Sequence, residues 1–513
     1  MRTRTSTMPA ALAVLLLCVP CVCAEMTGEQ EALTIARNYV NFILCNEGNW
    51  GGSDSAKVIH IEEFNRADRV LGYFCPIEPQ GFLVVSLYKE LAPVKAYSTQ
   101  SNLDPANKEG LTDLIKDKME HILDALETHL GRPLRADDRI DDLLEINYRA
   151  ISEILASNAF DPDDYRRPLF LRGGSAGMDY QEGETMLPCN WHQRPPFNHH
   201  CPSMGCDWWE YAYFNDNARV GCVATAGAQV MYHWRWPPYG EGPAPFDDWY
   251  DWANMCGEYN YDDMGWFNDE NGVPVTWDQI NAVANLCGEV AVGVDMSFGC
   301  GGSGADTADL EDAYEDYLRY DHDGWVVYRD DYEDPVDWFN ALKGQFNINR
   351  PVPYRVDEHA IVGDGWKEEW VAGRYYWYHM NYGWPTDGND TWYALDELYL
   401  GTEDEFFIAA VVPDSAIGSV LASYYPGASG MWRYFDRDVS GTQSTFGAGQ
   451  WLQILKSGFI LVNNGAAADT IRFYGEPNLH IRFFLDGDPW DLTRVLIQGG
   501  GMKIRGGGEM VIR

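Results

Sequence analysis

The sequence has few basic residues and few long apolar runs, and both shortages exclude some classes of function. Lys and Arg number 37 against 78 Asp and Glu, which gives a formal net charge of -41. Such a surface repels nucleic acid and anionic membranes, so neither is an expected partner. No stretch of about 18 or more apolar residues follows the N-terminal region, so no membrane span is expected in the mature chain.

Cysteine pairs at the spacing of metal or redox motifs are also missing after residue 24, because no Cys-x-x-Cys occurs there. This absence argues against a zinc ribbon or a thioredoxin-like motif. Nine cysteines remain in that part of the chain: Cys45, Cys75, Cys189, Cys201, Cys206, Cys222, Cys256, Cys287 and Cys300. In an oxidising compartment eight of them could form about four disulfides, and one would stay a thiol that parity does not identify.

The first residues have the features of an export signal. Two arginines precede a short apolar run at residues 10–22, and Val22 and Ala24 supply small side chains before a cut ahead of Glu25. We therefore predict a signal peptide at 1–24 and a secreted protein. An uncleaved anchor helix is the alternative, and a lipidated cysteine fits the preceding residues poorly.

Hydrophobic periodicity after the signal predicts a small α+β domain over 25–165. Apolar residues recur at helical spacing in 29–44, 111–130 and 138–156. Residues 81–87, GFLVVSL, form a β-branched apolar run that indicates a buried strand.

Composition changes twice beyond this domain. Residues 166–184 are polar and contain Arg-Arg and Gly-Gly pairs, so they are predicted to form an exposed linker. Residues 185–415 are dense in Trp, Tyr, Pro, Gly and Cys, with little helical periodicity. Residues 416–513 turn to glycine-punctuated apolar runs and end in GGGMKIR followed by GGGEMVIR at 499–513, which predicts an all-β appendage.

One segment, GCVATAGAQVMYHW at 221–234, has the pattern of a nucleophile helix. A cysteine at a helix start lies at the positive end of the helix dipole, which favours the thiolate. The small residues after Cys222 would let this helix pack closely against a neighbour. The alternative is a buried or disulfide-bonded cysteine on a core helix.

A second segment supplies a base. His359 lies in DEHAIVGDGW, and a strand-like stretch, RYYWYHMNYGW, follows it. We predict a β-hairpin with its loop at about 367–373, which would bring His359 close to Asn381. Asn381 could then accept a hydrogen bond from the imidazole and fix its tautomer. A core histidine is the alternative for His359, and His379 is better interpreted as a sheet residue.

A metal site is not expected, since the spacing of the histidines at 192, 199 and 200 does not fit a ligand set. The chemistry suggested by a cysteine and a histidine needs no cofactor.

These motifs resemble the streptopain family of papain-like cysteine peptidases over roughly 30–100 and 185–412. GCVATAGAQVMYHWRWP matches the nucleophile helix, so the resemblance implies that Cys222 is the nucleophile. DEHAIVGDGW implies that His359 is the base. HMNYGW implies that Asn381 orients the base and that Trp384 packs over or shields it.

The resemblance also implies the surroundings of the cleft. NWHQRPPFN at 190–198 is similar to the family's oxyanion segment and makes Gln193 the side-chain donor. VDMSFGCGGSGA resembles a glycine-rich wall of the substrate cleft, which includes Gly302 and Ser303. Residues 81–98 look like the strand pair of the family's inhibitory propeptide.

The fold implied is α+β: a papain-like domain with its nucleophile helix packed on an antiparallel sheet, after a small α+β propeptide and before an all-β appendage. Two positions depart from the family. Glu358 stands where glycine is usual, which could bias the cleft toward basic substrates, and Tyr382 stands where tryptophan is usual.

The resemblance implies a secreted cysteine endopeptidase, made as a zymogen, that cleaves proteins by acyl transfer and is inhibited by its own propeptide. Two alternatives remain: a non-catalytic surface or binding protein with a degenerate core, and an amidase or transglutaminase that uses the same two residues.

Overall fold

A computed structural model describes most of the chain before residue 413 and five short strands after it. The described residues are 24–135, 138–166, 182–209, 211, 215–237, 239–247, 249–262, 264–322, 324–356, 358–384, 391–395 and 405–412, with the backbone of 421–424, 431–435, 450–454, 471–474 and 495–498. Residues 1–23, almost the whole predicted signal, and 167–181, most of the predicted linker, lie outside them. No helix within the described ranges is long and apolar enough to cross a membrane.

The described residues of the N-terminal region contain three α-helices and five strands. They are α1 (Glu29–Glu47), β1 (Lys57–Val58), β2 (Glu62–Arg66), β3 (Arg69–Glu78), β4 (Phe82–Ser86), β5 (Val94–Ser98), α2 (Gly110–Leu130) and α3 (Arg149–Leu155). The predicted helices at 29–44 and 111–130 are confirmed, and each ends at a glycine in the left-handed conformation, where no Cβ is in the way. The predicted strand at 81–87 is confirmed as β4.

The helix predicted over 138–156 is mostly wrong. Only α3 is α-helical there, after a single 3₁₀ turn at Asp141–Leu143. Asn147 explains the late start, because its side chain accepts a hydrogen bond from the backbone N–H of Arg149 and so competes with helical bonding.

The part of the next region that the structure describes holds four α-helices and eight strands. They are α4 (Cys222–Trp234), β6 (Asn260–Tyr261), β7 (Phe267–Asn268), α5 (Trp277–Gly293), α6 (Asp309–Asp316), β8 (Trp325–Tyr328), α7 (Pro335–Phe346), β9 (Val352–Val356), β10 (His359–Trp370), β11 (Arg374–Asn381), β12 (Thr391–Ala394) and β13 (Phe406–Ala409). Four α-helices therefore form in a stretch of the sequence that shows little helical periodicity. The helix α5 even begins with a capping box between Thr276 and Gln279, a start signal that the sequence displays.

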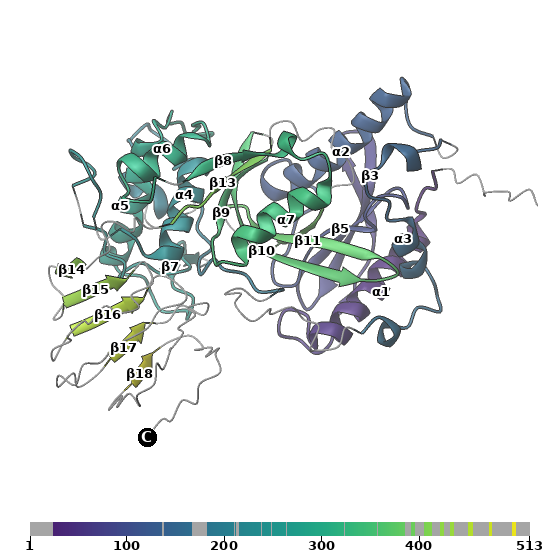
Figure 1. Ribbon diagram of the computed structural model, residues 1–513, viewed down its shortest axis with the longest axis horizontal. Helices are drawn as coiled ribbons and strands as arrows, with labels where there is room; N and C mark the ends of the chain where they lie inside the picture. The colour runs from purple at the N-terminus through teal and green to yellow at the C-terminus, as the bar shows by residue number, and fades with distance from the viewer. Residues whose placement is uncertain are drawn as a thin grey trace, which may run out of the picture.

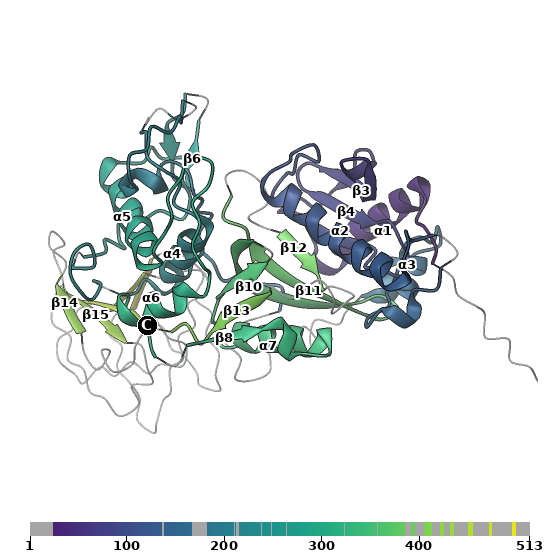
Figure 2. The same cartoon turned by 90° about the horizontal axis from the view of Figure 1, so that it is seen from above.

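One antiparallel sheet runs through both regions. Its strand order is β1-β3-β4-β5-β12-β11-β10-β9-β13-β8, with β2 paired to β3. The junction is the pairing of β5 with β12, where Tyr97 lies opposite Trp392. In Figures 1 and 2 the N-terminal elements lie at one end of this sheet and α4, α5 and α6 lie at the other. The predicted hairpin is confirmed as β10 and β11, joined by residues 371–373.

Two hydrophobic clusters contain side chains from both regions. Tyr39 of α1 and Tyr97 of β5 pack against Trp377 of β11 with ring centroids 5.8 and 5.1 Å apart. The phenol of Tyr375 accepts a hydrogen bond of 2.8 Å from the backbone N–H of Val94. Because apolar burial is the main stabilising term, the N-terminal region and the sheet stabilise one another.

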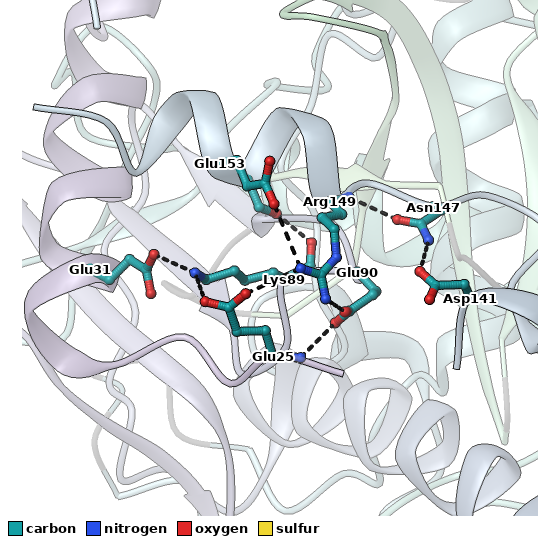
Figure 3. A network of polar contacts seen from close by, with 9 residues as sticks. Glu25, Glu31, Lys89, Glu90, Asp141, Asn147, Arg149 and Glu153 are labelled. Carbon is teal, nitrogen blue, oxygen red and sulfur yellow. Dashed lines mark hydrogen bonds and ion pairs between the residues drawn. The ribbon is translucent and has the colours of Figure 1, made fainter. Parts of the chain in front are cut away.

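A network of charges fixes the start of the N-terminal region (Figure 3). Glu90 is fully buried and is bound by the guanidinium of Arg149, which also contacts Glu25 at 3.1 Å. Lys89 contacts Glu25 and, at 2.7 Å, Glu31 of α1. These contacts tie the chain entry, the loop after β4 and α3 together.

The described strands beyond residue 420 agree with a β-rich C-terminal segment. They are β14 (Leu421–Tyr424), β15 (Met431–Phe435), β16 (Gln450–Ile454), β17 (Ile471–Tyr474) and β18 (Val495–Gln498). The β14–β15 pair is antiparallel, whereas β15–β16 and β17–β18 are parallel. The glycine repeat at 499–513 lies outside the described residues.

Candidate active site

Cys222 is the first residue of α4, a helix packed against α5 and β10. Gly221, just before it, has φ of 94°, and a Cβ there would come within 2.6 Å of the Met296 side chain. Only glycine fits this turn without strain. The turn leaves Cys222 at the positive end of the helix, where the first backbone N–H groups have no partner within the helix.

His359, the first residue of β10, faces the sulfur of Cys222. Burial disfavours the thiolate, but the charge of His359, its hydrogen bond, and the backbone N–H groups of Ala360 and Val223 favour it. Together they lower the pKa of Cys222 to about 7. Burial opposes charge on His359 as well, yet the nearby Cys222 raises the pKa of the imidazole above its usual value. The pair therefore favours a thiolate and an imidazolium.

Other cysteines in the described residues show the opposite shift. Burial raises the pKa of Cys75 and Cys201 to about 12, and burial raises that of Cys256 to about 11. A thiol with so high a pKa is almost wholly protonated at neutral pH and is a poor nucleophile. Cys222 is therefore the thiol that the fold activates.

The outer nitrogen of His359 has two competing neighbours. Nε2 lies 3.0 Å from the backbone oxygen of Tyr382, which can only accept a hydrogen bond. The indole Nε1 of Trp384, which can only donate, lies 3.0 Å from the same Nε2. A protonated Nε2 satisfies Tyr382, and an unprotonated Nε2 satisfies Trp384, so the position of Trp384 affects which form the imidazole takes.

Asn381 lies at the end of β11, near His359, but its polar atoms bind elsewhere. Its Nδ2 donates to the backbone oxygen of Cys189 at 3.0 Å. Its Oδ1 accepts from Gln229 Nε2 at 3.0 Å and from the backbone N–H of Gly383 at 3.1 Å. Among the described residues it makes no hydrogen bond to His359. The structure thus gives the imidazole contact to the Tyr382 carbonyl instead.

Gln193 lies beside the start of α4, although 29 residues separate it from Cys222 (222 − 193). Its backbone oxygen accepts a hydrogen bond of 3.0 Å from Val220, two residues before Cys222. The Gln193 side chain is buried. Next to it, burial lowers the pKa of His192 to about 3, so this imidazole is neutral and its Nδ1 accepts from the Arg194 N–H at 3.2 Å.

The glycine-rich segment forms a loop closed by Ser303. The Ser303 hydroxyl donates to the backbone oxygen of Arg219 at 2.7 Å and accepts from the N–H of Gly299 at 3.0 Å. The Ser303 hydroxyl thus forms its hydrogen bonds with backbone groups of the protein. Gly302 and Glu358, the other two residues predicted to line the cleft, are exposed.

A disulfide ties this loop to another. Cys206 and Cys300 are bonded, and the cysteines at 45, 75, 189, 201, 222, 256 and 287 are thiols. The expectation of about four disulfides is therefore not met in the described residues. Cys75 lies buried on β3 and Cys45 lies near the end of α1. The number of cysteines alone does not predict which of them the fold brings close enough to bond.

His379 is a sheet residue, as its sequence context predicts. It is a buried residue of β11, and its Nδ1 lies 2.5 Å from Asp364 Oδ1. No group of three His, Cys, Asp or Glu side chains in the described ranges could hold a metal ion.

Comparisons with known proteins agree with this arrangement. Residues 191–393 match the Peptidase C10 family, and residues 24–122 match the Spi protease inhibitor family. Streptopain of Streptococcus pyogenes is 24% identical over 405 residues, which cover 73% of this chain and 87% of streptopain. Thiol protease/hemagglutinin PrtT of Porphyromonas gingivalis is 23% identical over 424 residues, which cover 76% of this chain and 41% of PrtT.

Two solved structures are also similar. A prointerpain A fragment of Prevotella intermedia is 21% identical, with a TM-score of 0.47, and the alignment covers 69% of this chain and 98% of the fragment. Active interpain A of the same organism is 24% identical, with a TM-score of 0.34 and coverage of 49% and 98%.

Proposed function

The chain belongs to the Peptidase C10 family and is therefore a cysteine protease, made as a zymogen with an inhibitor propeptide. We propose that Cys222 is its nucleophile and His359 its base. The observation that carries this assignment is the facing pair itself. Cys222 begins α4, His359 begins β10, and each shifts the pKa of the other toward the charged form.

The reaction is acyl transfer to and from sulfur. The Cys222 thiolate attacks the carbonyl carbon of a peptide bond, and the imidazolium of His359 gives its proton to the leaving amine. Neutral His359 then takes a proton from a water molecule, whose oxygen attacks the thioester carbon. The carboxylic acid leaves, and the thiolate and imidazolium are restored.

Gln193 is the proposed side-chain donor to the oxyanion, together with the backbone N–H of Cys222. The place of this buried side chain beside the start of α4 supports the role. Asn381 is proposed as a positioning residue for the base. Its side chain accepts a hydrogen bond from the backbone N–H of Gly383, and this bond holds the turn in which the Tyr382 carbonyl accepts from His359. Trp384 covers the imidazole.

The N-terminal region inhibits by covering this site, and a contact at the start of α2 supports it. A Cβ on Gly110 would lie 3.5 Å from the Trp384 ring, so the propeptide helix packs directly against the indole whose N–H meets His359. While α2 is in place it covers the side of the site formed by Trp384, and release of α2 would open that side to substrate.

Further boundaries are proposed with it. Cleavage ahead of Glu25 exports the chain, and cleavage between about 161 and 188 separates the propeptide of 25–165 from the catalytic region of 185–415. Gly302, Ser303 and Glu358 border the substrate cleft. The segment 416–513 carries none of the reacting groups and should be dispensable for hydrolysis of a small peptide.

Two measurements test this function. Cys222→Ala should fold and fail to hydrolyse casein; digestion by that variant would remove Cys222 as the nucleophile. Wild-type material should reach full casein-hydrolysing activity only after the chain is cut between 161 and 188, a cut that mass spectrometry detects. An uncut 25–513 chain with full activity would refute inhibition by the propeptide.

A further inference from the structure

Gln229 is a buried polar side chain on the nucleophile helix that the reaction does not use. It lies seven residues after Cys222, two helical turns along the same face of α4. Its side chain is about 1% exposed. Its Nε2 donates one hydrogen bond of 3.0 Å to the backbone oxygen of Trp191 and another of 3.0 Å to Asn381 Oδ1.

The orientation of these two amides is fixed by their partners. The backbone oxygens of Trp191 and Cys189 can only accept, so Gln229 and Asn381 must both present their NH₂ groups to them. Asn381 Oδ1 then faces donors from Gln229 and Gly383. Every contact is a matched donor and acceptor, and a flip of either amide would break at least two of them.

Gln229 itself is only half satisfied. Its Oε1 is buried and has no hydrogen-bond partner among the described residues. A buried acceptor left unpaired destabilises a fold. An apolar side chain at this position would avoid that cost. We therefore attribute the presence of a glutamine here to the two hydrogen bonds that its NH₂ group donates.

Those contacts join three pieces of the site. Trp191 lies two residues before Gln193, and Asn381 and Gly383 flank Tyr382, the residue whose carbonyl meets His359. The other end of the bridge is α4, which carries Cys222. We infer that Gln229 is a positioning residue for catalysis: with Asn381 it holds the Gln193 segment at a fixed distance from the nucleophile. This inference rests on the proposed role of Gln193.

The size of the effect follows from geometry. A second tie, from Val220 to the Gln193 backbone oxygen, would remain after loss of Gln229, so the segment should shift rather than detach. A donor displaced by about 1 Å from the developing oxyanion costs about 10²-fold in rate. Substrate binding elsewhere in the cleft is unaffected, so KM should change by less than about twofold.

The test compares Gln229→Met, which preserves volume and removes both donors, with Tyr314→Phe. Tyr314 is a matched control because its buried hydroxyl also bonds α4, donating to the Gly227 oxygen at 3.0 Å, without contacting the Gln193 segment. Both are made in the full chain and processed by tagged wild-type enzyme that is then removed. Gln229→Met should lose about 10²-fold in kcat, and Tyr314→Phe should retain wild-type kcat.

Two further measurements separate positioning from general damage. The rate at which iodoacetamide alkylates Cys222 needs no oxyanion donor and should be unchanged in Gln229→Met. Added to Gln193→Ala, Gln229→Met should cost less than about threefold more, because both act on one donor. If Gln229→Met yields no folded enzyme, Gln229→Asn, which keeps an amide too short to span both partners, replaces it with the same expectations.

The outcomes are distinct. Unchanged kcat in Gln229→Met, equal losses in hydrolysis and alkylation, or full multiplication with Gln193→Ala would each overturn the inference. If Gln193→Ala itself keeps wild-type kcat, the proposed oxyanion donor fails first, whatever Gln229→Met does.

Discussion

A buried ion pair between the propeptide and the catalytic region offers a quantitative test. Lys118 of α2 contacts Glu405, which precedes β13, and the two side chains are only 6% and 4% exposed. Glu405 also accepts a hydrogen bond of 2.9 Å from the Tyr354 hydroxyl. The change Lys118→Met keeps the apolar stem and removes the charge, so the buried carboxylate of Glu405 loses its ion pair with Lys118.

The expected loss depends on pH. Removal of one partner of a buried pair costs about 3–5 kcal/mol. Protonation limits that cost, because a glutamate in water has a pKa of about 4.3 and neutralising it at pH 7 takes about 2.7 × 1.36, or roughly 3.7 kcal/mol. At pH 5 the same step takes about 1 kcal/mol. Lys118→Met should therefore lose about 3–4 kcal/mol at pH 7 and about 1 kcal/mol at pH 5.

The assay is urea unfolding of the 25–513 chain carrying Cys222→Ala, which prevents self-digestion. Tryptophan fluorescence should report one transition, because two hydrophobic clusters and one sheet contain residues of both regions. Adding Glu405→Gln to Lys118→Met should recover most of the loss. Lys57→Met, which breaks a surface pair with Glu78, should leave unfolding unchanged. An equal loss at pH 5 and pH 7, or no loss, would refute the reasoning.

Three other predictions concern the site and its supports. As the pH rises, the rate of alkylation of Cys222 should increase with a midpoint near pH 7 and then stay high. The rate of hydrolysis should fall again above the raised pKa of His359, because the leaving amine then loses its proton donor. Stopped-flow labelling and peptide hydrolysis across pH 5–10 measure the two profiles. Arg149→Met, which strands the buried Glu90, should destabilise the zymogen by about 3 kcal/mol in urea. Cys206→Ser should cost about 2–5 kcal/mol and make stability insensitive to reductant.

Local signals made much of the framework predictable. The helical period and terminal glycines define α1 and α2, and the hairpin follows from two strand-like runs around a short turn. The start of α4 at Cys222 follows from a glycine, a cysteine and a run of small residues. Each of these depends on neighbours within a few residues, which a single sequence displays.

Long-range contacts were not predictable in the same way. The pairing of β5 with β12 joins residues almost 300 positions apart, and no local pattern encodes it. The partner of His359 proved to be the Tyr382 carbonyl, a backbone group that every residue carries and no sequence motif distinguishes. Gln229 had one available signal, its seven-residue spacing from Cys222 on a helix face, but that spacing alone does not identify its partners.

The central claim is that Cys222 is the one activated thiol, and labelling tests it most directly. Processed enzyme is treated with a limiting amount of iodoacetamide at pH 7, and residual casein hydrolysis is compared with peptide mapping of every cysteine. Since the pKa of Cys222 is about 7 and those of Cys75 and Cys201 are about 12, label should appear on Cys222 in proportion to the activity lost. Activity that survives complete labelling of Cys222, or that disappears with label on another cysteine, would contradict the assignment.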